Sequence, residues 1–130
     1  MFVALVLDTS VLIQGHADPL DRVAISAVSI AELHFGVLIA TDDDARAQRL
    51  QRLAAIEEAF FPLPFDTDVA RECGRLHAAV ARRGGKPRRR AFDLAIAATA
   101  NVHDVPLLTL NVADFKLIDD LVDVRSPERS

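Results

Sequence analysis

FVALVLDTS, residues 2–10, is the stretch that decides the fold. Residues 2–7 form an unbroken apolar run, which is typical of a strand buried on both faces, and Asp8 follows it directly. Further along the chain, short apolar segments alternate with segments of helical periodicity. Strands that alternate with helices predict an α/β fold in three layers, with a mostly parallel central sheet flanked by helices.

Apolar runs and turn residues give the expected positions of the elements. The expected strands lie at residues 2–7, 23–26, 62–65, 106–110 and 121–124. The expected helices lie at residues 29–40, 42–60, 66–80 and 92–103, with a short one after Asn111. Ser29 and Glu32 have the spacing of a capping box for the first helix, and Asp66 can cap the third. No repeat or linker divides the sequence, so we expect residues 1–130 to form a single domain.

The composition limits the kinds of partner. The net charge of −4 argues against a general nucleic-acid binder, although it does not exclude local basic patches. Trp and Tyr are absent, so we do not expect aromatic stacking to dominate any nucleic-acid contact. Cys73 is the only cysteine, which excludes an internal disulfide and suits a reducing compartment. The apolar run at 2–7 is too short for a signal or membrane segment, so we expect a cytoplasmic protein without a membrane partner.

Four carboxylates stand where a strand ends or a helix begins, namely Asp8, Glu32, Asp93 and Asp114. In open α/β sheets, ligands bind outside the carboxyl ends of the strands. Carboxylates gathered at such an edge repel one another, so either their pKa values rise or they hold a hard divalent cation. Oxygen ligands without paired Cys or His suit Mg²⁺ or Mn²⁺ rather than zinc.

Each of these carboxylates also has a purely structural interpretation. Asp8 can cap the next helix, and Glu32 occupies the third position of the capping box. Asp114 would lie in the first turn of the last helix, and Asp93 follows a basic segment whose charge it can balance. Asp66 also follows a short strand, so position alone does not exclude it from a site.

A basic segment precedes Asp93, with six Lys or Arg residues between positions 82 and 90. One interpretation is a solvated turn. The other is that Arg88, Arg89 and Arg90 contact phosphates beside Asp93, and phosphate contacts fix the register of a nucleic acid without reading its bases.

Four motifs, taken together, resemble the PIN-domain ribonucleases, in particular the VapC toxins of VapBC toxin–antitoxin pairs. The motifs are Leu7-Asp8-Thr9-Ser10, Ser29-Ile-Ala-Glu32-Leu-His-Phe-Gly36, Phe92-Asp93-Leu-Ala-Ile-Ala-Ala98 and Thr109-Leu-Asn111-Val-Ala-Asp114-Phe115. They follow the family's usual order and cover essentially the whole chain. In the last motif, Leu110 and Val112 stand where the family commonly has polar or charged residues. The resemblance implies a PIN-like fold, and it sets Asp66 aside from catalysis.

The resemblance also implies an activity, which is Mg²⁺- or Mn²⁺-dependent endonucleolytic hydrolysis of RNA phosphodiester bonds by metal-activated water. The residues implied to be catalytic are Asp8, Glu32, Asp93 and Asp114, with Thr9, Ser10 and Asn111 in support. Asp8 and Asp93 are the implied metal ligands, and Glu32 and Asp114 join them directly or through water. Whether one or two ions bind, and which RNA is cut, stay open.

The family further implies partners, namely an RNA substrate, a cognate VapB-type antitoxin and a second copy of the chain in a homodimer. An antitoxin Arg that pairs with the acidic site is the implied inhibitory contact. We expect the antitoxin groove on helices at 27–40 and 45–60, which carry apolar residues on more than one side. These residues are Phe35, Leu38, Ile39, Ile56 and Phe60. A plain buried core is the alternative explanation for them.

Two other functions stay open. A phosphotransfer enzyme or receiver could use Asp8 as the phosphoryl acceptor, but a dehalogenase-type phosphatase would need a second Asp where Ser10 stands. A PIN-like interaction domain without catalysis would keep the fold, and the presence of all four acids disfavours it. Neither a dinucleotide fingerprint nor a phosphate loop ending in Gly-Lys-Ser/Thr is present in the sequence.

Overall fold

A five-stranded sheet forms the centre of the molecule. The computed structural model describes residues 3–14 and 22–127. Every neighbouring pair of strands is parallel, in the order β3-β2-β1-β4-β5. The strands are β1 (Leu5–Leu7), β2 (Val23–Ser26), β3 (Phe61–Leu63), β4 (Leu107–Leu108) and β5 (Val124–Arg125). The predicted α/β fold with a parallel central sheet is therefore confirmed.

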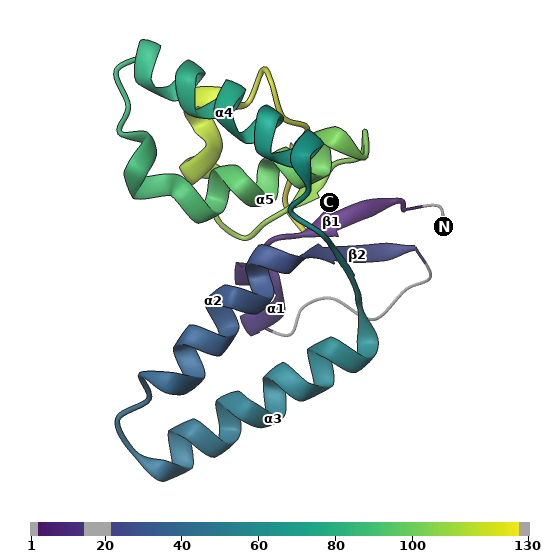
Figure 1. Cartoon of the computed structure of the whole chain (residues 1–130), viewed down its shortest axis with the longest axis vertical. Coiled ribbons are helices and arrows are strands. Elements are labelled where there is room, and N and C mark those ends of the chain that lie inside the picture. The colour runs from purple at the N-terminus through teal and green to yellow at the C-terminus, as the bar shows by residue number, and fades with distance from the viewer. Residues whose placement is uncertain (1–2, 15–21, 128–130) are drawn as a thin grey trace.

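Helices cover both faces of this sheet (Figure 1). They are α1 (Thr9–Gln14), α2 (Ala27–Leu38), α3 (Asp43–Ala59), α4 (Thr67–Arg82) and α5 (Ala91–Val102), with 3-10 helices η1 (Pro87–Arg90) and η2 (Val112–Ile118). The hairpin of α2 and α3 projects to one side of the sheet, and α4 and α5 pack together on the other (Figure 1). Within the described residues, no helix is both long and apolar enough to cross a membrane.

The central strands divide the apolar residues between two cores, because successive side chains of a strand point to opposite faces. Val6 of β1 and Ala24 of β2 belong to the core shared with α4, α5 and η2. Leu7 and Ile25, the next residue on each strand, belong to the core shared with α1, α2 and α3. The sheet is thus buried on both faces, as the unbroken apolar run of β1 predicts.

The strand order brings two distant segments together at the carboxyl edge. The chain builds outward from β1 through β2 to β3, and then returns to place β4 on the other side of β1. The carboxyl ends of β1 and β4 are therefore adjacent at the point where the order reverses, which is where open α/β sheets bind ligands. Asp8 follows β1 and Thr109 follows β4 at this point.

Several predicted boundaries need correction. The capping box at Ser29 is wrong: α2 begins two residues earlier and is capped by Ser26, whose Oγ accepts a hydrogen bond from the Val28 N–H at 3.0 Å. The strand expected at 62–65 ends at residue 63, and the strand expected at 121–124 lies at 124–125. Part of the expected strand at 2–7 falls on Phe2, which lies outside the described residues.

Other boundaries agree with the predictions. Asp66 caps α4, because its Oδ1 accepts from the Val69 N–H at 3.0 Å. Asp42 caps α3 in the same way, with the Ala45 N–H at 2.8 Å. The segment at 82–90 is an exception: it was expected as a loop, but it contains the short helix η1.

Two glycines end α4 and fix the path of the basic segment. Gly84 has φ +86, and the N–H groups of Gly84 and Gly85 donate to the carbonyls of Ala81 and Val80 at 3.2 and 2.9 Å. This is the Schellman pattern of helix termination, in which a left-handed residue follows the C-cap. Gly85 lies so close to Val80 and Leu117 that it has no room for a side chain.

We predict that Gly85→Ala lowers the free energy of unfolding by about 1–3 kcal/mol, because a Cβ in a filled space forces its neighbours to move. The added Cβ would lie 2.7 Å from the Val80 Cγ1 and 2.5 Å from the Leu117 Cδ1. Urea denaturation measures the change. The matched control is Gly74→Ala inside α4, where no atom lies within 4 Å of the new Cβ. That variant should be up to about 1 kcal/mol more stable than the wild type, owing to helix propensity. Equal effects of the two substitutions would contradict this packing.

Candidate active site

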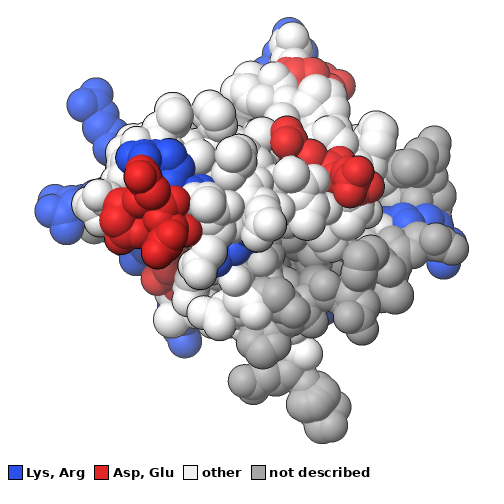
Figure 2. Space-filling view, turned by 90° about the horizontal axis from the view of Figure 1, so that it is seen from below, with Lys and Arg blue, Asp and Glu red and all other residues white. Residues whose placement is uncertain are grey.

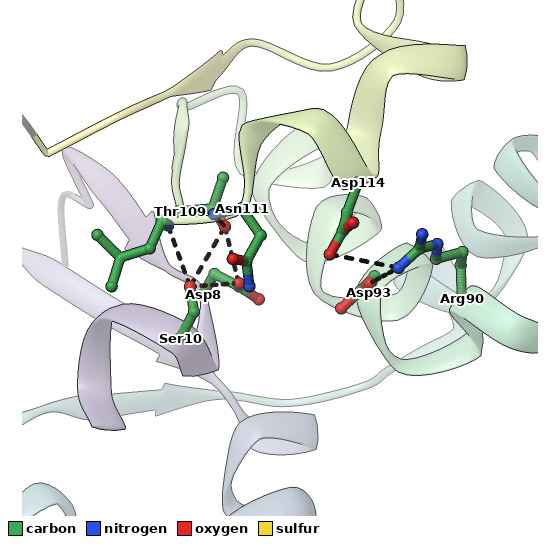
Figure 3. A network of polar contacts seen from close by, with 8 residues as sticks. Asp8, Ser10, Arg90, Asp93, Thr109, Asn111 and Asp114 are labelled. Carbon is green, nitrogen blue, oxygen red and sulfur yellow. Dashed lines mark hydrogen bonds and ion pairs between the residues drawn. The ribbon is translucent and has the colours of Figure 1, made fainter. Parts of the chain in front are cut away.

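Asp8 lies at the centre of the site and is 3% exposed. Its Oδ2 accepts hydrogen bonds from the hydroxyls of Ser10 at 2.8 Å and Thr109 at 2.9 Å (Figure 3). Two hydroxyl donors stabilise the carboxylate and fix its rotamer. They also leave this oxygen less available to attack a phosphoryl group, so the arrangement disfavours Asp8 as a phosphate acceptor.

The same hydroxyls join the first and last motifs. The Ser10 Oγ accepts from the Leu110 N–H at 3.1 Å, and the Thr109 Oγ1 accepts from the Asn111 N–H at 3.0 Å. The Asp8 N–H donates to the Leu108 carbonyl at 2.8 Å. The segment that leads from β4 to η2 is therefore held against the end of β1. The sequence analysis included Ser10 and Asn111 as supporting residues, but it did not single out Thr109.

Glu32 is held by a chain of hydroxyls that starts on α1. The Thr9 Oγ1 donates to the Glu32 Oε1 at 2.6 Å and lies 2.8 Å from the Ser29 Oγ. Thr9 has a single hydroxyl hydrogen, so when it donates to an ionised Glu32 it must accept from Ser29. Ser29 is fully buried. Glu32 is therefore positioned by Thr9 of α1, which Ser29 supports in turn, and it has no part in a capping box.

Asp93 and Asp114 form the other half of the site. Asp93 lies in the first turn of α5, and Asp114 lies in the first turn of η2. Arg90, the last residue of η1, lies with its Nη1 3.2 Å from the Asp114 Oδ2 and 3.7 Å from the Asp93 Oδ2 (Figure 3). The sequence analysis placed Arg90 among the phosphate contacts. It allowed Asp93 to balance the charge of the basic segment, but it did not predict the ion pair with Asp114.

The acids are near enough to influence one another. The pKa of Asp93 is raised from 3.8 to about 6, chiefly by burial and then by the charges of Asp8, Glu32 and Asp114, while Arg90 opposes the rise. Burial also raises the pKa of Glu32, with a further contribution from Asp8, against the hydrogen bond from Thr9. The fold therefore brings the four predicted carboxylates into one electrostatic cluster.

The donor chemistry of this cluster fits a hard divalent cation, because carboxylate and hydroxyl oxygens are the ligands such ions prefer. The side chains as they stand are not closed around an ion. Within residues 3–14 and 22–127, no three or more His, Cys, Asp and Glu side chains lie close enough together to hold a metal. The Asp8 Oδ2 already accepts two hydroxyl hydrogen bonds, and the Oδ2 atoms of Asp93 and Asp114 already pair with the Arg90 guanidinium.

Two hollows adjoin the cluster. One has a volume of about 370 Å³ and is lined by Glu32 and residues 88–93. The other has a volume of about 560 Å³ and is lined by Lys86, Arg89, Arg90, Asp93 and Asp114, among others. Both hollows therefore combine cationic side chains with the acids, which suits an anionic polymer that must approach a carboxylate cluster.

A third hollow, of about 410 Å³, lies away from the acids and is lined by residues of α4, α5 and the segment before β5. Its most buried acid, Glu72, already accepts hydrogen bonds from Arg75 and from the Asn101 amide. These bonds lower the pKa of Glu72 and use its oxygens, so this hollow does not offer a second acidic site.

Comparison with known proteins gives consistent results. The sequence profile described as PIN domain matches residues 5–121. Ribonuclease VapC5 of Mycobacterium tuberculosis is 40% identical over 126 residues, which cover 92% of this chain and 90% of the relative. Ribonuclease VapC of Rickettsia bellii is 31% identical over 127 residues, covering 90% and 92%.

Solved structures show the same similarity. A crystal structure of VapBC-5, a member of the VapBC family of toxin–antitoxin systems from Mycobacterium tuberculosis, superposes with a TM-score of 0.76 at 38% identity. The match covers 95% of this chain and 97% of that chain. DNA-bound VapBC from Salmonella typhimurium gives a TM-score of 0.79 at 22% identity, covering 97% and 99%, which shows a shared fold.

We predict that Asp93→Asn raises the free energy of unfolding in the presence of a chelator, by about 1–2 kcal/mol at about pH 7.5. In the folded protein the pKa of Asp93 is above its ordinary value, so the folded state binds more protons than the unfolded state between pH 3.8 and about 6. Wild-type stability should therefore fall as the pH rises through this window, and the asparagine variant should lose less. Urea denaturation at about pH 4 and pH 7.5 measures the difference. A gain of the same size at both pH values would contradict the electrostatic explanation.

Proposed function

This chain belongs to the PIN-domain family, and from that premise we propose that it is a metal-dependent ribonuclease, the toxin of a VapBC-type toxin–antitoxin pair. One observation carries the enzymatic part of the proposal. Carboxylates from four separate segments lie at the carboxyl edge of the sheet, where burial and then the charges of the other three raise the pKa of Asp93. The fold pays a cost in repulsion for this arrangement, and a cation at the site removes that cost.

The proposed cofactor is Mg²⁺ or Mn²⁺, with Asp8 and Asp93 as ligands and Glu32 and Asp114 joining them directly or through water. When bound, such an ion lowers the pKa of a bound water and offsets the negative charge of the phosphodiester. The likeness to ribonucleases named VapC supports RNA as the substrate.

The chain's own residues prepare this site. Ser10 and Thr109 hold the Asp8 carboxylate in one orientation. The side chain is therefore already ordered before the proposed cation binds. Thr9 does the same for Glu32 through its 2.6 Å hydrogen bond. Arg88 and Arg89 line the hollow beside Asp93, where they would bind the phosphates on either side of the cleaved bond.

A VapB-type antitoxin is the proposed protein partner, supported by the likeness to the VapBC-5 structure. Part of the apolar set expected on α2 and α3 is exposed and supports a docking surface there. Phe35, Leu38 and Ile39 at the end of α2 are 60%, 64% and 54% exposed. Ile56 and Phe60 are buried in the core that α3 shares with the sheet, which is the alternative that the sequence analysis gave for them.

Leu50 of α3 is 53% exposed and adds to the apolar surface of the α2–α3 hairpin. Figure 2 shows the molecule from below, with acidic atoms gathered in a few places and most of the described surface carrying neither Asp, Glu, Lys nor Arg. Burial of the exposed apolar residues of the α2–α3 hairpin by the antitoxin or by a second copy of the chain would remove apolar area from water.

We predict that Asp8→Asn and Asp93→Asn each lower the rate of RNA cleavage by about 100-fold or more, because each removes a charged ligand. The measurement is cleavage of labelled RNA with Mg²⁺, Mn²⁺ or a chelator. Asp66→Asn is the matched control, since Asp66 also follows a strand but caps α4. It should cut at the wild-type rate. Wild-type cleavage in the chelator, or by the Asp8 variant, would overturn the proposal.

We predict that the double variant Arg88→Gln, Arg89→Gln binds RNA more weakly and with a flatter salt dependence. For single-stranded RNA, the slope of log affinity against log salt should fall by about 0.7 for each lost phosphate contact. Binding is measured in chelator over a salt series, so that cleavage does not interfere. An Arg125→Gln variant serves as control, because Arg125 pairs with Asp123 at β5. An unchanged slope in the double variant would show that these arginines are only a solvated turn.

A further inference from the structure

The three consecutive arginines of η1 differ in what they contact. Arg88, Arg89 and Arg90 are equivalent in the sequence. Among the ion pairs of the described residues, Arg90 forms two and its neighbours form none. A single atom of Arg90, Nη1, makes both contacts, at 3.2 Å to Asp114 and 3.7 Å to Asp93. One guanidinium therefore lies between two carboxylates that come from different elements.

We propose that Arg90 is an internal counter-ion, which holds Asp93 and Asp114 together in the metal-free protein and leaves them when the divalent cation binds. This inference rests on the proposed function, because it concerns the same site. It gives Arg90 a role distinct from that of Arg88 and Arg89, which have no such partner to leave.

Charge favours the exchange. The side chains of Asp93 and Asp114 are only 27% and 34% exposed, so water screens their mutual repulsion poorly. Arg90 supplies one positive charge where the proposed ion would supply two. The ion and the guanidinium would compete for the Oδ2 atoms of Asp93 and Asp114, because both are cations that take carboxylate oxygens as partners.

Geometry makes the exchange easy. The same nitrogen, Nη1, forms both ion pairs. Neither pair is therefore of the bidentate, closely spaced kind that binds a carboxylate strongly. The Arg90 side chain is 45% exposed, and it lines both hollows beside the acids, of about 370 and 560 Å³. Its guanidinium can therefore swing into either hollow without disturbing the core.

The exchange also connects the cation with the substrate. Once released, the Arg90 guanidinium lies in a hollow that Arg89 also lines, and it becomes available to an RNA phosphate. Binding of the ion and binding of the phosphate then favour each other, because each takes one partner away from the Arg90 ion pair. Arg90 is accordingly a positioning residue that acts through the two acids.

The experiment is calorimetric titration of Mn²⁺ into the metal-free protein without RNA. We expect Arg90→Gln to bind Mn²⁺ about 5- to 10-fold more tightly than the wild type, since the ion no longer displaces a cation. Arg88→Gln removes the same charge two residues away, and its affinity should stay within about 2-fold of the wild type. Arg90→Lys, which keeps the charge, should restore weaker binding.

A second measurement separates this exchange from a merely structural role. In chelator, Arg90→Gln should melt at a lower temperature than the wild type, because the two acids lose their counter-ion. Saturating Mn²⁺ should then raise its melting temperature by more than it raises that of the wild type. Circular dichroism of both proteins checks that the variant is folded at the start.

The outcomes distinguish this inference from the proposed function. If the wild type and Arg88→Gln bind Mn²⁺ and Arg90→Gln binds no more tightly than they do, the counter-ion role is overturned and the metal site stands. If the wild type does not bind Mn²⁺, or if Asp93→Asn binds it equally well, both the metal site and the counter-ion role are overturned.

Discussion

Repulsion between carboxylates is the constraint on which the rest of this structure depends. The fold places Asp8, Glu32, Asp93 and Asp114 at one edge of the sheet, where burial and mutual repulsion raise the pKa values of Asp93 and Glu32. Each acid is accompanied by a group that offsets this repulsion. Hydroxyls from α1 and from the end of β4 serve Asp8 and Glu32, and a guanidinium from η1 serves the other two. These polar contacts offset the repulsion between the four carboxylates and so stabilise the folded state.

The apolar architecture sets where these charges meet. Alternation along β1 sends Val6 into one core and Leu7 into the other, so the strand is fixed from both sides. A strand fixed in this way has no freedom of register, because a shift of one residue would exchange the two faces. The position of Asp8, one residue beyond the strand, is fixed with it. The position of the polar site is therefore set by the apolar packing on both faces of the sheet.

The sequence predicted the elements well where the signal is local. Strand β2 at Val23–Ser26, the cap at Asp66, and the approximate extent of α5 follow from runs and caps within a few residues. The Ser29 cap was wrong because Ser26 offers the same chemistry one turn earlier, and tertiary packing buries Ser29 instead. Thr109 and the Arg90–Asp114 ion pair were missed for another reason. Thr109 bonds to a residue 101 positions away, and Asp114 belongs to a different element from Arg90, so neither contact has a local signal in the sequence.

The contact between Thr109 and Asp8 has a consequence for the biogenesis of the protein. The two residues are separated by 101 positions, and the pairing of β1 with β4 has a similar span. Contacts so distant in the chain form late, since the intervening loop must be closed first. A growing polypeptide that has not yet reached β4 lacks half of the hydroxyl support and one of the acids. On the proposed function, a chain still being synthesised lacks a complete site, and competence to cut RNA would arise only when translation is nearly finished.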